Sequence, residues 1–450
     1  MTESSHSKAP LAHPLALFVR RFRRNSRGNI AVISALVLPV LLGTFGLGTE
    51  AVSWYANQRG EQSAADSAAL AAASNAGADY ANEARSVTAR YGFTDGQSGV
   101  TVSALNNQAC PTGGSNCYKV TISKIVPLLL AQAVGYAGDA TQGGAPAKNI
   151  TATSVAIQGM SPRPYCILAL ASSGTTPALR SNGAPSANLS GCNVMSNTAA
   201  TCNGGNLNAD NGDAHGTDNG CGNAQHSNLS AVPDPYAALV NNVPANPCGS
   251  YPQIPGAHGP ALPASNQLSG MLTWSGNITK CGDIRLTGPV TINTDINGAV
   301  LVIENGQLDT NGYAIRTSSG SALTIVFSGT PGNYTHAPTG GGTLDIAAPT
   351  TGAWSGVALY QDPRLTQGVD VSAAGNSPTW DITGLVYLSK ASATFSGAVN
   401  KASNGLSCFV LVVDNLLVNG TANILPKGQC AQAGLNMPTN PVPSRGKLLS

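Results

Sequence analysis

Charged residues are scarce in this chain of 450 residues, and aromatic residues are scarcer still. Only 10% of the residues are Asp, Glu, Lys or Arg, and 5% are Phe, Trp or Tyr, whereas soluble domains usually carry about 25% charged residues. This scarcity argues against a cytosolic enzyme that depends on Lys and Glu for solubility. Gly (52 residues) and Pro (28) are abundant instead. The hydrophobic content of 42% is ample for a packed core, so we do not expect a wholly disordered chain.

The motifs of common enzyme classes are also missing. The chain has no GxSxG, Walker A, HExxH or GxGxxG sequence. Beyond residue 60, acidic residues slightly outnumber basic ones and no basic patch occurs, which argues against nucleic-acid binding. We therefore expect a protein that is not an enzyme and that binds no cofactor.

One long uncharged segment lies near the N-terminus. Residues 30–48 (IAVISALVLPVLLGTFGLG) are almost entirely apolar, with Pro39 among them. Nineteen helical residues extend about 28 Å, close to the hydrocarbon thickness of a bilayer. The pattern predicts a transmembrane helix at 29–50. A cleaved secretory signal and a buried helix of a soluble domain are the alternatives.

Positive charge is concentrated directly before this segment, in the sequence RRFRRNSR at 20–27. The positive-inside rule therefore predicts that 1–28 is a basic cytoplasmic tail and that the chain after Glu50 lies outside the cytoplasm. Trp54 and Tyr55 stand where an interfacial aromatic anchor is expected.

Strong helix formers continue through residues 56–90. Ala64, Ala68, Ala71 and Ala72 are spaced to share one narrow helical face, on which small side chains allow another helix to approach closely. We expect a helical stalk with this alanine face directed to a partner. Packing of the face on the chain's own domain is an equally weighted alternative.

The sequence RGNIAVISALVLPVLLGTFGLGTEAVSWYANQRGEQSAADSAALAAA resembles the N-terminal region of TadG-like proteins of the Flp (tight adherence, Tad) pilus-assembly system. A basic stretch, an apolar helix with a proline, an acidic residue and an alanine-rich signature follow in the family's order. The residues that carry the resemblance are Gly28, Pro39, Glu50, Gln62, Asp66, Ala68, Ala69 and Leu70.

This resemblance implies a single-pass protein of the bacterial inner membrane. It also implies that the partners are the lipid bilayer and other Tad pilus-assembly proteins or pseudopilins. The family usually has Asp at the position of Glu50. Prepilin cleavage after Gly28 is not supported, because Ile33 stands where such pilins carry Glu. The metal site of von Willebrand type A domains is not carried over either, because residues 370–374 lack the second Ser of its motif.

Residues 51–160 are expected to form the helical stalk and a small α+β module. Strands are predicted at 100–105, 117–125 and 149–159, and a short apolar helix at 127–135.

Residues 161–440 change to short apolar strands separated by Gly, Asn and Ser, which predicts a mostly β domain. A parallel β-helix is the favoured architecture and a β-sandwich is the runner-up. We expect residues of about 204–270, which are rich in Asn, Gly, Pro and His, to form a polar loop excursion, and 441–450 to form a tail.

All ten cysteines follow the apolar segment, and none occurs in a CxxC or zinc-binding pattern. Disulfides in an oxidising compartment are therefore expected. Pairing of sequence neighbours is the simplest hypothesis, and other connectivities remain open. The neighbouring pairs are Cys110 with Cys117, Cys166 with Cys192, Cys202 with Cys221, Cys248 with Cys281, and Cys408 with Cys430.

Two groups of acidic residues are candidate sites. Asp210, Asp213 and Asp218 lie close together with Asn211, His215 and Asn219, a set of oxygen ligands that could hold Ca²⁺, although the bidentate Glu of an EF-hand is missing. A polar loop without metal is the favoured interpretation. Asp362, Asp370 and Asp381 could suggest a glycan-cleaving pair of acids, but scattered surface acids are favoured there too.

Three functions are therefore compared. The favoured one is a membrane-anchored envelope protein of Tad pilus assembly, whose β domain is a scaffolding or interaction surface. The alternatives are a membrane-tethered β-helix enzyme that acts on polysaccharides, and a surface adhesin unrelated to pili.

Overall fold

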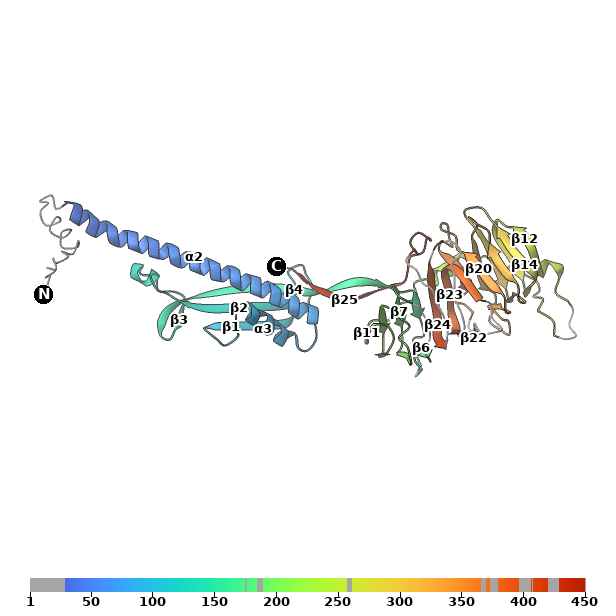
Figure 1. Ribbon diagram of the computed structural model, residues 1–450, viewed down its shortest axis with the longest axis horizontal. Helices are drawn as coiled ribbons and strands as arrows, with labels where there is room; N and C mark the ends of the chain where they lie inside the picture. The colour runs from blue at the N-terminus through green and yellow to red at the C-terminus, as the bar shows by residue number, and fades with distance from the viewer. Residues whose placement is uncertain are drawn as a thin grey trace, which may run out of the picture. The chain divides into compact units, whose positions relative to one another are not determined.

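The computed structural model describes residues 29–449 except 175, 184–188, 257–260, 366–369, 373–378, 396–405, 407 and 420–428 (Figure 1). The chain forms two compact units. The first takes in Met1–Met160 and Pro443–Ser450, and the second is Ser161–Val442. Gly28 and the basic tail that the sequence predicts at 1–28 lie outside the described residues.

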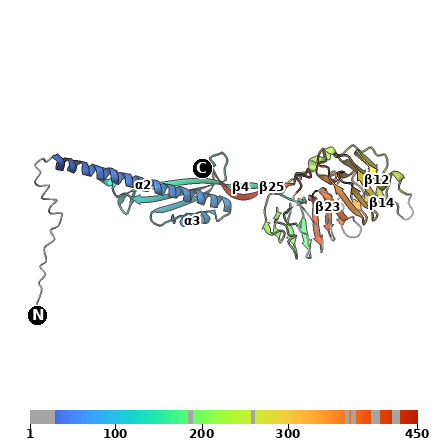
Figure 2. The same cartoon turned by 45° about the horizontal axis from the view of Figure 1, so that its top comes forward.

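The first unit is organised by one helix, α2 (Asn29–Asn75), which is 47 residues long and continuous through Pro39. At 1.5 Å per residue it extends about 70 Å. A second, shorter helix, α3 (Tyr80–Arg90), follows it. Figures 1 and 2 show that only the C-terminal part of α2 lies along the sheet of this unit.

The sheet of the first unit has the strand order β1-β2-β4-β25, with β3 paired to β4. Its strands are β1 (Val100–Gln108), β2 (Cys117–Pro127), β3 (Ala140–Gln142), β4 (Ala145–Pro164) and β25 (Thr439–Leu448). The strands predicted at 100–105, 117–125 and 149–159 lie within β1, β2 and β4. The helix predicted at 127–135 is only a 3-10 turn, η1 (Ala131–Val134). The tail expected at 441–450 is wrong, because most of it belongs to β25, which completes the sheet beside β4.

Strands are the main regular structure described in the second unit, and each strand pair described in it is parallel. Its strands are β5 (Ile167–Ala169), β6 (Leu179–Asn182), β7 (Asn193–Ser196), β8 (Ala200–Cys202), β9 (Asn211–Ala214), β10 (Asp218–Asn219), β11 (Ala224–His226), β12 (Gln267–Thr273), β13 (Gly276–Cys281), β14 (Ile284–Asn293), β15 (Ala299–Glu304), β16 (Leu308–Asp309), β17 (Ala314–Thr317), β18 (Leu323–Ser328), β19 (Pro338–Thr339), β20 (Thr343–Ala347), β21 (Val357–Gln361), β22 (Asp370–Ser372), β23 (Thr379–Phe395) and β24 (Phe409–Asn419). Two 3-10 turns, η2 (Ala237–Asn242) and η3 (Ala264–Asn266), lie between β11 and β12.

Many strands pair with the next strand but one, so β12 pairs with β14, β13 with β15, and β5 with β7. The last strand of the unit pairs with the first: Leu411 of β24 lies in register with Ile167 of β5. Pairing therefore runs from β12 through β24 to β5 and on to β11. Figure 1 labels β11 and β12 at the two ends of this stack.

β11 and β12 follow one another in the chain but lie at opposite ends of the stack of paired strands. The segment between them must therefore extend along the stack. Residues 227–266, here called the return connector, join β11 to β12. Among the described residues of the polar region expected at about 204–270, this connector and the short stretch 204–210 are the main parts that lack strands. The excursion is wrong for 211–226, where β9, β10 and β11 pair in parallel with their neighbours.

Two rows of apolar side chains explain why these strands are nearly charge-free. In the inner row, one fully buried aliphatic residue per strand stacks on the next, and these residues are Leu301, Ile325, Leu359, Val386, Leu411, Ile167 and Val194. The adjacent positions point to the opposite face and form an outer row: Val302, Val326, Tyr360, Tyr387, Val412, Leu168 and Met195.

The return connector covers the outer row. Its Val232 and Tyr236 are buried in the same apolar cluster as Tyr360 and Tyr387. The Tyr236 and Tyr387 ring centroids are 6.2 Å apart, and Asn197 exchanges hydrogen bonds with the backbone of Val232. Strands buried on both faces need apolar residues at successive positions, which explains the continuous runs in the sequence.

Candidate functional site

The N-terminal part of α2 has an unburied apolar surface. Leu36 is 69% exposed, Leu42 64% and Phe45 74%. The helix is long and apolar enough to cross a membrane, and it is the one such helix in the part of the chain that the structure describes. Residues 30–48 thus form a helix whose exposed surface is apolar, as in a segment that contacts lipid.

The C-terminal part of α2 is buried by its own unit. Six alanines on this part have no exposed surface: Ala64, Ala65, Ala68, Ala69, Ala72 and Ala73. They share an apolar cluster with Val102, Val120 and Ile122 of the sheet and with Ala84 of α3. Of the face expected to contact a partner, Ala64, Ala68 and Ala72 are therefore not available to one, whereas Ala71 is partly exposed. Packing on the chain's own domain, the alternative interpretation, is what the structure contains.

The polar residues of the resemblance support the same packing. The Gln62 side-chain amide donates hydrogen bonds to Asp66 Oδ1 at 2.7 Å and to the Thr153 carbonyl of β4 at 3.3 Å. Leu70 is partly buried against the alanine cluster. At Gly446 of β25, a Cβ atom would lie 2.8 Å from the Leu70 carbonyl oxygen, so only glycine fits without displacement.

A buried acid, Glu61, lies in the same helix and was not among the residues predicted from the sequence. It has no exposed surface, and neither of its carboxylate oxygens has a hydrogen-bond partner within the described residues. Its spacing of three and four residues before Ala64 and Ala65 is the signal that places it on the buried face.

Glu50 holds a loop against α2. Its Oε1 accepts hydrogen bonds from the backbone N–H groups of Leu129 and Leu130 at 2.5 and 2.6 Å, and Oε2 accepts one from Ala131 at 2.8 Å. Glu50 is 8% exposed. The sequence places an acid at the end of the apolar segment, but it contains no local sign that this acid binds residues 129–131.

The acids of the polar loop that was considered as a candidate Ca²⁺ site contact protein groups. Asp213, fully buried, accepts hydrogen bonds from Arg163 at 2.6 Å, from the Tyr165 hydroxyl at 2.6 Å and from His226 at 2.9 Å. Asp210 and Asp218 accept backbone hydrogen bonds from Gly191 and Cys221, respectively. Within the described residues, no three His, Cys, Asp or Glu side chains form a group that could hold a metal ion.

The Arg163–Asp213 pair could not be found from the sequence, because 50 residues separate its members. His226 lies beside Asp213 because β11 pairs with β9 in register. Burial raises the pKa of the nearby Asp218 to about 6.

The three carboxylates considered for glycan cleavage are not shown to form one site. Asp362 is paired with Arg364 and accepts a hydrogen bond from Ser328 at 2.8 Å. Asp381 lies on β23 in register with Asp345 of β20. The side chain of Asp370 lies outside the described residues.

A different acid, Glu304, lies near Asp362. It ends β15 in register with Ser328 of β18 and is 1% exposed. One of its carboxylate oxygens has no hydrogen-bond partner among the described residues. Burial, together with the nearby Asp362 charge, raises the pKa of Glu304 to about 7. Burial acts to raise the pKa of Asp362 as well, but hydrogen bonds from Arg364 and Ser328 keep it below its usual value.

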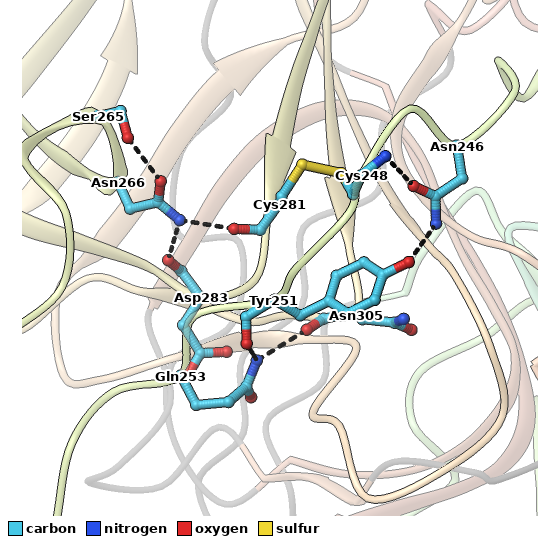
Figure 3. The surroundings of a disulfide bond; sticks show 9 residues. All are labelled: Asn246, Cys248, Tyr251, Gln253, Ser265, Asn266, Cys281, Asp283 and Asn305. Carbon is cyan, nitrogen blue, oxygen red and sulfur yellow. Dashed lines mark hydrogen bonds between the residues drawn. A yellow bond between two sulfur atoms is a disulfide. The ribbon is translucent and has the colours of Figure 1, made fainter. Parts of the chain in front are cut away.

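The ten cysteines form five disulfides, and each joins two cysteines that are consecutive in the sequence. The pairs are Cys110–Cys117, Cys166–Cys192, Cys202–Cys221, Cys248–Cys281 and Cys408–Cys430. Cys248–Cys281 ties the return connector to β13. Figure 3 shows the hydrogen bonds around it, including those from Asn266 to the carbonyls of Cys281 and Asp283.

Comparison with known proteins identifies the N-terminal part of the chain. No curated protein and no solved structure gives a significant match. The TadG-like resemblance inferred from the sequence is confirmed by a family model: residues 28–75 match Tad, described as putative Flp pilus-assembly TadE/G-like. This chain therefore carries a TadE/G-like segment, which includes all of α2 and is followed by a largely β region.

Proposed function

We propose that this protein is a single-pass, non-enzymatic envelope component of Flp/Tad pilus assembly. In this proposal the apolar part of α2 is anchored in the bacterial inner membrane, residues 1–28 are cytoplasmic, and the chain after Glu50 lies outside the cytoplasm. The main support for the proposal is that α2, the helix of the TadE/G-like segment, has two different parts. Its N-terminal part is apolar and exposed, and its C-terminal part is buried against the sheet of its own unit. Five disulfides favour an oxidising compartment for the units.

The second unit in this proposal is a parallel β-helix that serves as a scaffolding surface. The continuous rows of side chains, one residue per strand, support this architecture. The engagement of Asp213 by Arg163 and of Asp362 by Arg364 favours structural roles for these acids over catalytic ones.

Charged substitutions in the exposed part of α2 test the proposal without disturbing the alanine packing. Leu36→Glu with Leu42→Glu places two carboxylates in the apolar run, each at an expected cost of about 2 to 4 kcal/mol in a bilayer. The matched control is Tyr91→Glu with Leu105→Glu, at positions that are 51% and 47% exposed in the same unit.

In a strain that makes Flp pili, we expect the α2 variant to leave the membrane fraction and to abolish piliation, and the control to keep both. Normal membrane retention and normal pili in the α2 variant would contradict the proposal. Normal pili with lost surface binding would favour the adhesin instead.

A further inference from the structure

The loop at 127–136 (PLLLAQAVGY) has exposed apolar side chains beside the apolar part of α2. Leu129 is 77% exposed, Leu130 51% and Val134 50%. The loop contains no charged residue. A cluster of exposed apolar side chains of this kind marks a contact with a partner or a membrane.

Glycines on α2 fix where the loop lies along the helix. A Cβ atom on Gly46 would lie 2.9 Å from Cβ of Leu130, and one on Gly43 would lie 3.3 Å from Cγ1 of Val134. Both glycines belong to the apolar run, and Gly43 lies about 8 Å from its end at 1.5 Å per residue. That distance matches the depth of about 5 to 10 Å to which interfacial segments enter a bilayer.

Backbone N–H groups of the loop donate hydrogen bonds to acceptors within the chain, as an apolar environment requires. The N–H groups at 129–131 donate to the Glu50 carboxylate. Further along the loop, Gly135 donates to the Gln132 carbonyl and Tyr136 to the Ala131 carbonyl. The loop could therefore lose contact with water without leaving these donors unpaired.

Aromatic and charged residues mark the water side of this surface. The ring centroids of Trp54 and Tyr136 are 5.7 Å apart, and both residue types are enriched at membrane interfaces. Asp139, three residues after the loop, forms an ion pair with Lys148 of β4. The polarity thus changes over a short distance, as it does across the edge of a bilayer.

We propose that the loop at 127–136 is a second membrane contact, which enters the outer half of the bilayer beside α2, and that Glu50 holds it in place. Lipid acyl chains contact Leu129, Leu130 and Val134. The inference rests on the proposed function, because α2 must itself lie in lipid.

A photoreactive amino acid in the full chain tests this contact. The residue is placed at Val40 in the apolar run, at Leu129 in the loop, or at Leu105 on β1, which are 63%, 77% and 47% exposed. Each protein is reconstituted into vesicles of phosphatidylethanolamine and phosphatidylglycerol and irradiated, and lipid adducts are measured by mass spectrometry.

We expect adducts at Val40 and Leu129, and about tenfold fewer at Leu105. Adducts at Val40 with no excess at Leu129 over Leu105 would overturn the loop contact while leaving the anchor intact. Crosslinking of Leu129 to a second copy of the chain would overturn it as well. An absence of adducts at Val40 would overturn the membrane anchor itself.

Variants of Glu50 test its positioning role in the Leu129-labelled chain. Glu50→Ala should lower lipid adducts at Leu129 several-fold and leave those at Val40 unchanged, whereas Glu50→Gln, which keeps one acceptor oxygen, should fall between. Glu83→Ala removes an exposed acid of α3 and is the matched control. Unchanged adducts at Leu129 in Glu50→Ala would overturn the role of Glu50.

Discussion

Glu50 and Leu130 are 80 residues apart in sequence, yet the Glu50 carboxylate accepts a hydrogen bond from the Leu130 backbone at 2.6 Å. The acid stands at the end of the apolar run, and the loop that it binds is apolar as well. Glu50 therefore links the end of the exposed apolar part of α2 to the loop that follows β2.

Removing the Glu50 carboxylate should expose the amides that it binds. Hydrogen bonds to a charged acceptor stabilise by about 1.5 to 3 kcal/mol, so Glu50→Ala should speed amide exchange at 129–131 by about 10- to 100-fold. Hydrogen exchange of the full chain measures this, with Glu83→Ala as the control. Equal exchange rates in the wild type and Glu50→Ala would show that these hydrogen bonds contribute little.

Breaking the Arg163–Asp213 pair should destabilise the second unit. The side chain of Asp213 is fully buried and that of Arg163 is 17% exposed, so Arg163→Met leaves a buried charge without its main partner, at a cost of about 3 to 5 kcal/mol. Denaturant unfolding followed by the fluorescence of Trp274, Trp354 and Trp380 measures the loss. Adding Asp213→Leu to Arg163→Met should recover part of it, and a double variant as unstable as the single one would contradict this explanation.

Glu304 should make the stability of the second unit depend on pH. Its pKa is raised from 4.5 to about 7, mainly by burial, so the folded state binds the proton more tightly than the unfolded state. The stabilising contribution is therefore fully present below pH 4.5 and is lost as the pH rises to about 7, by up to about 3 kcal/mol.

The difference in unfolding free energy between Glu304→Gln and the wild type, measured at each pH, separates the effect of Glu304 from that of other titrating groups. One such group is His336, whose pKa burial lowers to about 4, so its contribution is lost as the pH falls from 6.5 through 4. Glu304→Gln should gain stability relative to the wild type between pH 4.5 and 7, in unfolding experiments at constant ionic strength. A difference that does not change with pH would contradict the raised pKa.

Loss of the Cys248–Cys281 disulfide should release the return connector. The two cysteines are 33 residues apart, and closing a loop of that length stabilises by about 3 to 4 kcal/mol in the chain-entropy description. Cys248→Ser with Cys281→Ser should increase proteolysis within the connector. Cys110→Ser with Cys117→Ser, in the first unit, is the control and should leave the connector protected.

Local sequence patterns predicted much of the architecture. The uncharged run at 30–48 predicted the helix, strand-like alternation predicted β1, β2 and β4, and the Gly- and Asn-punctuated runs predicted a mostly β second unit. These features depend on hydrophobic periodicity and composition, which are visible in one sequence.

Features that depend on contacts between distant residues could not be predicted. β25 pairs with β4, and β24 pairs with β5. In both pairs the two strands come from distant parts of the sequence, so no local pattern predicts the pairing. The alanine face could not be assigned to a partner or to the chain's own sheet, because spacing alone fits both. The Arg163–Asp213 and Glu50–Leu130 contacts likewise carry no local signature.

The topology of the membrane segment is the central claim, and paired reporters fused after Ser450 test it most directly. One reporter is an enzyme that folds only in an oxidising compartment outside the cytoplasm, and the other fluoresces only inside the cell. We expect the full-length fusion to give activity from the first reporter alone. Signal only from the cytoplasmic reporter would contradict the account.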